Sequence, residues 1–326
     1  MLEPEGIQDP PGRKRRRRPS LRIRASSVPS AYGRIEPMTK LLACLILLAA
    51  QPRPLKILIV DGMNNHDWQY STAAVRQILA ATGRFTVDAS TVDASHPDQW
   101  KPDFQKYNAV FVNFNGGHKE DGVRWPKQAE ESLERYVRAG GGVIIFHAAN
   151  NAFLHWDAYN EMIGLGWRDK TFGPGLAVAD DGRTVTIPKG TGMNPGHGPR
   201  HDFQMRVVDP SHPITKGIPQ FWMHPSEQLT HGQHGPAQGL TILTSAYSKD
   251  SLQNEPMDWV RNYGKGRVYT TMLGHSWKNE PNPNYECIGF QTLLSRGVEW
   301  AASGRVTIPV PAKFPSPSSV LTSPLH

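Results

Sequence analysis

Three histidines of this sequence each follow a short apolar run that is predicted to be a β-strand, and together they could bind a metal ion. They are His66, His147 and His275. Neutral imidazoles combined with a carboxylate are good ligands for zinc and related divalent metals, and an open coordination position permits catalysis. With Glu227 as the carboxylate, the sequence predicts a metal site made of His66, His147, His275 and Glu227.

The same residues allow other roles. The imidazoles could instead hydrogen-bond to loop carbonyls, or bind a sugar without a metal. Glu227, if it is not a ligand, could remove a proton beside a sugar carbonyl, and His224 could then protonate the leaving oxygen. These two residues are three positions apart, which places them on opposite faces of a regular strand, whereas a turn could bring them together. Glu227, His147 and His224 are therefore the candidate catalytic residues.

The elements that must position these residues alternate between strand and helix. Apolar runs bounded by turn signals are typical of strands buried on both faces of a parallel sheet. The predicted order is strand 55–60, helix 71–81, strand 85–91, strand 108–115, helix 126–139 and strand 143–146. This alternation predicts an α/β fold of three layers, with a doubly wound, mostly parallel, flavodoxin-like sheet. Because the carboxyl ends of parallel strands share one edge, we expect the three histidines to converge there.

The second half of the chain has a weaker pattern. Residues 164–235 are rich in glycine, proline and aspartate, so we expect loops over a pocket, with His197 and His201 lining the pocket and His231 and His234 at the surface. Short strands are predicted at 201–208, 227–230, 240–246, 257–262 and 267–273, and a helix at 285–302 closes the domain. We therefore expect one domain over 54–304 and a loose tail, rich in proline and serine, over 305–326.

The first 51 residues differ from the rest in charge and hydropathy. The 326-residue chain has a net charge of +7, and residues 1–37 hold nine basic and four acidic side chains, so the remainder carries 7 − 5 = +2. A nearly neutral body does not favour a nucleic-acid partner. We expect 1–37 to be a disordered basic leader, or to precede a true start at Met38. Residues 38–51 resemble a signal peptide that is too short for a stable membrane span, which predicts a secreted or periplasmic protein.

Several short motifs, in a fixed order, resemble the ThuA-like (trehalose-utilisation) family over residues 55–302. They are His66 after the first strand, the glycine-rich run that ends at His147, the segment 203–217, Trp222-Met223-His224-Pro225-Ser226-Glu227, the segment 263–268, Leu273-Gly274-His275 and the final 294–301. The resemblance implies a fold like that of class I glutamine amidotransferases. The family usually has Asp-Glu-Leu-Tyr where this chain has Ser226-Glu227-Gln228-Leu229, which keeps the glutamate and changes its neighbours.

The resemblance also implies carbohydrate metabolism, including oxidised (keto) disaccharides. A glutaminase needs a thiolate at the sharp turn after the central strand, and this chain has His147 there, so glutaminase chemistry is excluded. No Gly-x-Ser-x-Gly turn is present for a serine nucleophile. Indole rings in the loops suit the apolar faces of sugars, while Asn and Asp supply hydrogen bonds. The predicted sugar-binding residues are Asp61, Trp68, Asn150 and Trp222.

Three functions compete. The first is an exported enzyme that acts on a glycoside or keto-sugar by metal- or carboxylate-assisted hydrolysis, elimination or isomerisation, with a divalent metal and no nucleotide cofactor. The second is a non-catalytic sugar-binding protein with the same fold, and the third is an enzyme acting on another small metabolite. The first is favoured because several titratable groups gather at strand ends, where simple binding needs fewer. The sequence does not specify the oligomeric state.

Overall fold

The computed structural model describes residues 53–116 and 122–325. The predicted basic leader and signal peptide therefore lie outside the described residues. Within the described ranges, the helices are all too short or too polar to cross a membrane. Residues from Arg53 onward form one compact unit.

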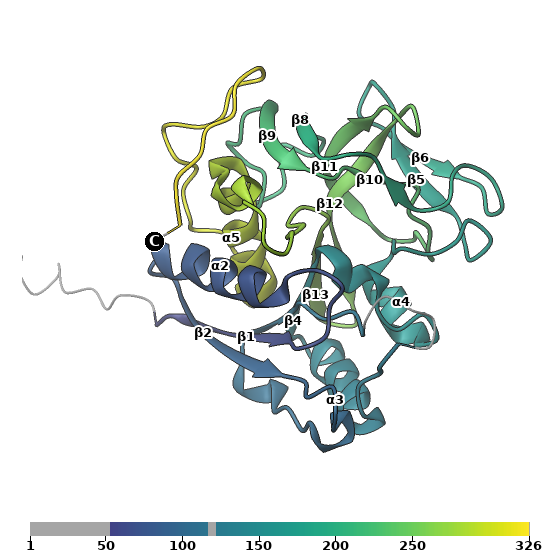
Figure 1. The fold of residues 1–326 in the computed structure, drawn as a ribbon, viewed down its shortest axis with the longest axis vertical. Coiled ribbons are helices and arrows are strands. Elements are labelled where there is room, and N and C mark those ends of the chain that lie inside the picture. The colour runs from purple at the N-terminus through teal and green to yellow at the C-terminus, as the bar shows by residue number, and fades with distance from the viewer. Residues whose placement is uncertain (1–52, 117–121, 326) are drawn as a thin grey trace, which may run out of the picture. The chain divides into compact units, whose positions relative to one another are not determined.

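One half of the central sheet is parallel, as the sequence predicts. Its strands lie in the order β2-β1-β3-β4-β13, and each pair of neighbours is parallel. These strands are β1 (Leu55–Asp61), β2 (Phe85–Thr91), β3 (Ala109–Val112), β4 (Gly142–Phe146) and β13 (Gly266–Thr271). All four residues of β3 and all five of β4 are buried, which explains their continuous apolar sequences. Figure 1 shows these strands crossing the lower half of the described unit.

The other half of the sheet is antiparallel and continues from β13 in the order β12-β11-β8-β9. The strands are β8 (His201–Val207), β9 (Phe221–Glu227), β11 (Thr241–Ser248) and β12 (Gln253–Tyr263), and a hairpin of β5 (Gly175–Val178) and β6 (Thr184–Ile187) pairs with β12. A second small sheet consists of β7 (Gly196–His197) and β10 (Thr230–His231). The predicted parallel sheet is therefore part of a mixed one, because the later strands are joined by loops rather than by crossover helices.

Helices cover both faces of the sheet and complete the three predicted layers. On one face α2 (Trp68–Ala81) and α5 (Ile288–Ser303) pack with Ile57 and Ile59 of β1. On the other face α3 (Lys127–Arg138) and α4 (Asp157–Ile163) pack with Leu58 and Val60. Successive side chains of a strand point to opposite faces, so one apolar strand supplies both cores. Short 3₁₀ helices occupy Pro97–Gln99, Phe104–Lys106, His147–Asn151 and Pro283–Glu286.

The tail after residue 304 is not loose, contrary to the sequence prediction. Glu299 of α5, which is buried, accepts hydrogen bonds from the backbone N–H groups of Thr307 (2.7 Å) and Ile308 (3.0 Å). Further along, the tail carbonyl of Ser316 accepts from the backbone N–H of Met223 at 2.9 Å. Figure 1 shows the tail, in yellow, beside α5. Proline and serine content indicated flexibility, but backbone partners elsewhere in the unit hold the segment in place.

A chain that ends at Gly304 is expected to be less stable than the full chain. It loses the hydrogen bonds to Glu299 and Met223, and also the packing of Phe314 on the buried Trp222, whose ring centroids are 5.9 Å apart. We expect the free energy of unfolding to fall on the order of 3 kcal/mol. Urea denaturation measures this change, and an unchanged midpoint would mean that the tail contributes nothing.

Candidate functional site

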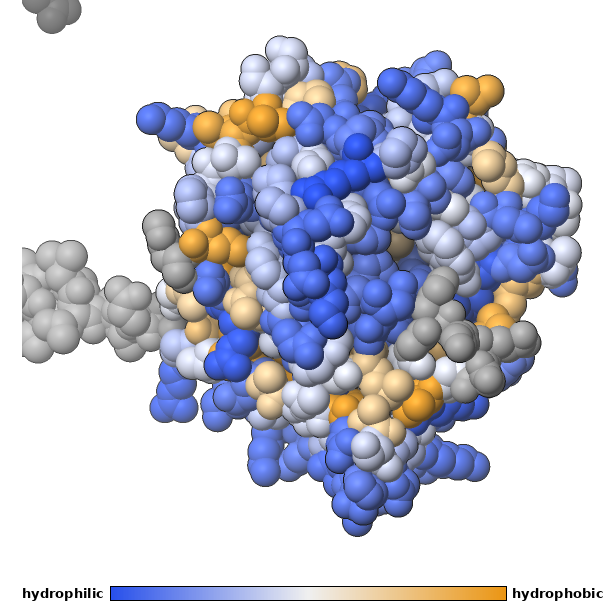
Figure 2. Space-filling view, in the orientation of Figure 1, coloured by the Kyte–Doolittle hydropathy of each residue, from blue (hydrophilic) through white to orange (hydrophobic). Residues whose placement is uncertain are grey.

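A cavity of about 630 Å³ lies where the chain leaves β1, β4 and β13. It is lined by residues 64–69 after β1, by His147, Ala148 and Asn151 after β4, and by Met272, His275, Ser276, Trp277 and Lys278 after β13; Trp167, His197, Gln228 and Thr230 complete the wall. Figure 2 shows a largely hydrophilic face with a hollow near its middle. The position agrees with the rule that open α/β sheets bind ligands at the carboxyl ends of their strands.

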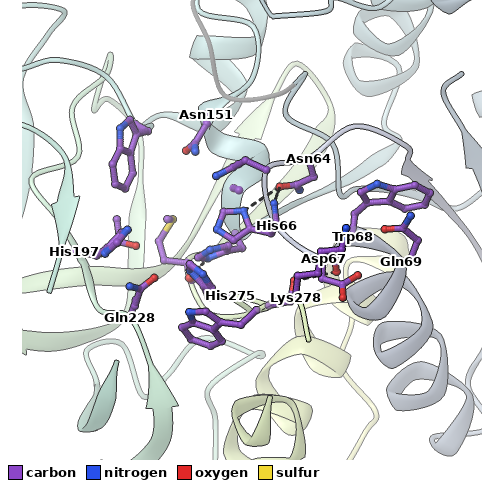
Figure 3. Close-up of a pocket in the computed structure, with 18 residues that line it drawn as sticks. Asn64, His66, Asp67, Trp68, Gln69, Asn151, His197, Gln228, His275 and Lys278 are labelled. Carbon is purple, nitrogen blue, oxygen red and sulfur yellow. Dashed lines mark hydrogen bonds between the residues drawn. The ribbon is translucent and has the colours of Figure 1, made fainter. Parts of the chain in front are cut away.

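The three histidines that follow the strands meet in this cavity. The ligand atoms of His66, His147 and His275 all lie within 4.8 Å of one another. Their ring centroids are 4.8 Å apart for His66 and His147, 4.2 Å for His66 and His275, and 5.1 Å for His147 and His275. Figure 3 shows His66 and His275 side by side, with Asn151, His197 and Gln228 around them. The separation is far below the distance of about 10 Å that would exclude a shared metal.

His147 occupies a strained turn directly after β4. Its backbone has φ of 45°, a left-handed conformation that is uncommon for residues other than glycine. Its Nδ1 lies 2.6 Å from the carbonyl oxygen of Met272. A carbonyl only accepts hydrogen bonds, so Nδ1 carries the proton and the lone pair is on Nε2. At this turn Nδ1 of His147 is therefore bound to Met272, and the lone pair of Nε2 can bind a ligand.

His66 is oriented in a similar way by the loop between β1 and α2. Its Nδ1 lies 3.0 Å from Oδ1 of Asn64, which also accepts the backbone N–H of His66 at 3.1 Å. Asp67 then caps α2 by accepting the backbone N–H of Tyr70 at 3.1 Å. The loop thus ends in a regular N-cap. As with His147, an oxygen acceptor at Nδ1 leaves Nε2 with the lone pair.

His275 is held mainly through its backbone and its ring face. Its N–H donates to Oε1 of Glu227 at 3.2 Å, and its imidazole stacks on Trp277 with centroids 4.1 Å apart and planes at 27°. The guanidinium of Arg200 lies 4.2 Å from the centroid of the same Trp277 ring. These contacts place His275 between a buried acid and an aromatic wall.

Burial disfavours the protonated form of two of the three imidazoles. Burial lowers the pKa of His147. Burial, together with the neighbouring His147 and His66, lowers the pKa of His275 well below its usual range. A protonated imidazole in this crowded place would lack water and would repel its neighbours. The neutral form of imidazole is the one that binds metals.

Two expected catalytic residues do not reach the cavity. Glu227 and His224 are both fully buried and absent from its wall, and they face each other with Nε2 and Oε2 at 3.4 Å. They converge because Ser226 has φ of 46° and the pairing of β8 with β9 shifts register beside it. Glu227 also lies outside the group of residues that could hold one ion. The roles of Glu227 as ligand or base and of His224 as acid are therefore wrong for this cavity.

Of the four residues predicted to hold a sugar, the cavity wall contains only Trp68. The carboxylate of Asp61 is buried and accepts from the hydroxyls of Thr72 and Thr91, both at 2.7 Å. Asn150 is buried behind the wall, where its amide donates to Gln233 at 2.6 Å. Trp222 is fully buried in the core of the α5 face. These three predictions are therefore wrong, because each of these side chains contacts other buried residues of the protein and does not line the cavity.

Several residues of the wall were not predicted as ligand contacts. The clearest are Asn64, Asn151, Gln228 and Lys278. His197 lines the cavity as expected, 6.1 Å from His275 between ring centroids. Polar residues are ordinary in loops, so nothing in the sequence distinguishes those that face a cavity from those that face solvent.

The wall that carries His197 rests on a second buried polar group. Thr230 of β10 lines the cavity, and the following His231 is buried, as is His234, although both were expected at the surface. Below this turn the buried Glu255 accepts the backbone N–H of Gly232 at 3.3 Å and the hydroxyl of Ser251 at 2.6 Å. Burial raises the pKa of Glu255 to about 7.

Fold and cavity together define an α/β protein like the class I glutamine amidotransferases, with a histidine at the strained turn where those enzymes carry cysteine. The family described as trehalose utilisation, ThuA, matches residues 56–301. The chain belongs to this family.

Two solved structures are similar to this chain, the first in sequence and fold and the second in fold alone. A ThuA-like protein from Parabacteroides merdae is 36% identical, with a TM-score of 0.77 over 83% of this chain and 98% of its own. A ThuA-like protein from Bacteroides uniformis is 16% identical, with a TM-score of 0.51 over 80% of this chain and 96% of its own, which is a likeness of fold. A search of curated proteins found no match.

Replacing Glu255 by Gln is expected to stabilise the protein at alkaline pH. The folded pKa is raised from 4.5 to about 7, so the stabilisation from the protonated acid is complete below about pH 4.5 and is lost as the pH rises through 7. Gln stays neutral and can still pair with Ser251 and Gly232. At pH 8 the gain should be on the order of 1–3 kcal/mol, and near pH 4.5 it should vanish. Urea denaturation at both values measures it; an equal effect at both would contradict the raised pKa.

Proposed function

We propose that His66, His147 and His275 hold a divalent transition metal, and that the cavity acts on an uncharged carbohydrate. The observation that carries the proposal is the approach of three imidazoles to within 4.8 Å between ligand atoms. The reactions that fit are hydrolysis, elimination or isomerisation of a glycoside or keto-sugar.

The donor set fits such an ion. His66 and His147 each direct Nδ1 at an oxygen acceptor, which leaves Nε2 as the ligand atom and fixes the ring orientation, as is usual for metal-binding histidines. Two nitrogens on one tetrahedral zinc are about 3.3 Å apart, given bonds of about 2.0–2.1 Å. The ligand atoms of the three histidines lie within 4.8 Å of one another, so binding a metal would require the most distant pair to move closer by up to about 1.5 Å. Side-chain rotation within the cavity supplies movement of that size.

A metal held by three protein ligands keeps an open position, where it polarises a carbonyl or lowers the pKa of a bound water. The residues of the chain would bind and orient the ligand around it. Trp68 and Trp167 offer indole rings to the C–H faces of a sugar, and the amides of Asn151 and Gln228 offer hydrogen bonds to hydroxyls.

The charge of the wall supports an uncharged ligand. Apart from the histidines, the charged residues of the wall are Asp67 and Lys278, one of each sign. Asp67 is already engaged as the N-cap of α2. A phosphorylated or acidic sugar would need more basic side chains than this. The family description, trehalose utilisation, points to the same class of ligand.

Sugar binding without catalysis is the second candidate, and one observation favours it. The carboxylate of Glu227 and the imidazole of His224, which would have transferred protons, are enclosed away from the cavity. Besides His66, His147 and His275, the cavity wall contains a further imidazole, that of His197. If the protein is catalytic, His197 would hold a sugar hydroxyl beside the metal.

Replacing His147 by Ala is expected to abolish metal binding and any activity together. The free energy of unfolding should change by no more than about 1 kcal/mol, because residues of a functional site rarely optimise stability. The measurements are elemental analysis of the purified protein and turnover of a panel of glycosides and their 3-keto forms. His96→Ala is the matched control, since the exposed His96 pairs with Asp93 away from the cavity.

The outcomes separate the candidates. Metal in the full chain with turnover, both lost in the His147 variant, supports the enzyme. Sugar binding without turnover supports the binding protein. A chain that takes up no metal at any supplied concentration would overturn the metal site.

We also propose that the protein is exported, on the strength of the apolar segment 41–50 after Met38 and Lys40. Expression from Met38 in a bacterial host should give a periplasmic protein whose N-terminus lies near Gln51. N-terminal sequencing of the fractionated protein checks this, and an intact leader in the cytoplasm would contradict it.

A further inference from the structure

The carboxylate of Glu227 is fully buried, and its partners are all donors. Oε2 accepts the backbone N–H of Gly274 at 2.8 Å and the side-chain amide of Asn284 at 2.9 Å. Oε1 accepts the backbone N–H of His275 at 3.2 Å and that of Gln228 at 3.3 Å. A buried carboxylate requires this degree of hydrogen bonding, since it has lost its water.

The two residues that Glu227 holds from one side are held from the other side as well. Asn284 donates to the carbonyl of His275 at 2.8 Å, with the same amide group that contacts Glu227. The hydroxyl of Tyr285 donates to the carbonyl of Gly274. Both peptide N–H groups and both carbonyls of Gly274 and His275 are thereby engaged.

The backbone at this point admits glycine alone. Gly274 has φ of 108°, and a Cβ there would lie 2.2 Å from the ring of Phe146, the last residue of β4. The loop after β13 thus passes tightly over the end of β4, where His147 begins its turn. A small change in the path of this loop moves His275 relative to His147.

A buried imidazole faces Glu227 from its own strand, with Nε2 of His224 3.4 Å from Oε2 of Glu227. Burial would lower the pKa of His224, but its contacts with Cys287 and Glu227 raise it to about 9. Burial would raise the pKa of Glu227, but the hydrogen bond and charge of His224 lower it.

From these contacts we propose that Glu227 is a positioning residue, which sets the place of the His275 imidazole through the backbone of Gly274 and His275, with Asn284 as its partner. The inference rests on the proposed metal site. This positioning role explains why Glu227, expected from the sequence to act on the ligand, is buried instead. Glu227 does not line the cavity, but it holds His275, which does. Partners of this kind typically alter metal affinity about 10- to 100-fold when they are replaced.

The test is Glu227→Gln in the full chain, with Co²⁺ as the probe. The amide of Gln must direct its NH₂ group at an N–H donor, because both carboxylate oxygens of Glu227 accept from N–H groups. We expect Co²⁺ affinity to fall about 10- to 100-fold and the visible spectrum of the bound ion to change. The amides of Gly274 and His275 should exchange hydrogen faster than any change in global unfolding accounts for.

Asp258→Asn is the matched control. Asp258 of β12 is also a fully buried acid, and it accepts from the hydroxyls of Thr244 of β11 and Tyr269 of β13. Hydroxyls can reverse their hydrogen bonds, and the cavity wall is not involved. We expect Co²⁺ affinity within about twofold of the unmodified chain, because separate sites act independently.

Asn284→Ala keeps the test decisive if the Gln variant does not fold. It removes the contact with the carbonyl of His275 and leaves the charge of Glu227 in place. Its Co²⁺ affinity should fall in the same direction, and to a smaller extent. Unchanged affinity and unchanged exchange at 274 and 275 in the folded variants would overturn the positioning role while leaving the metal site standing.

A different result identifies failure of the proposed function. If the unmodified chain binds no Co²⁺, the metal site is wrong, and the positioning role is then decided by hydrogen exchange alone. Faster exchange of the Gly274 and His275 amides in either variant supports it, and equal exchange overturns it.

Discussion

The parallel pairing of β1, β3, β4 and β13 is the constraint on which the candidate site depends. The register aligns Val60 with Val112, Val112 with Ile145 and Phe146 with Thr271. Neighbouring strands lie about 4.8 Å apart, so the ends of β1, β4 and β13 fall within about 15 Å along one edge. Short loops of fixed path then bring the three imidazoles together. A slip of one residue in any pair would turn the following side chain to the other face.

Buried polar groups fix those loops in place. Asp61 at the end of β1 accepts from two threonine hydroxyls, and Glu227 accepts from the loop after β13. Both acids lie below the cavity, where they satisfy donors that an apolar core would leave unpaired. Burial raises the pKa of Glu255 and of Asp258, two further buried acids.

The three imidazoles are crowded, and burial lowers the pKa of His147 and of His275. His147 also occupies a left-handed backbone conformation that stores strain. In the amidotransferase-like fold this turn projects one side chain above the sheet, and here that side chain is an imidazole whose Nδ1 is tied to the carbonyl of Met272. The fold therefore supplies the geometry, and the residue at the turn decides the chemistry.

The sequence by itself determined the parallel α/β core and the meeting of His66, His147 and His275, because both follow from apolar runs whose period and order are local properties of the chain. Only the tertiary structure decided where Glu227, Trp222, Asp61 and Asn150 point. The alternation of faces holds for a regular strand, and the left-handed Ser226 breaks it beside Glu227. The tail likewise looked loose because its partners, Glu299 and Met223, are contacts made only on folding. Side-chain direction at an irregular position depends on long-range packing, which a single sequence does not record.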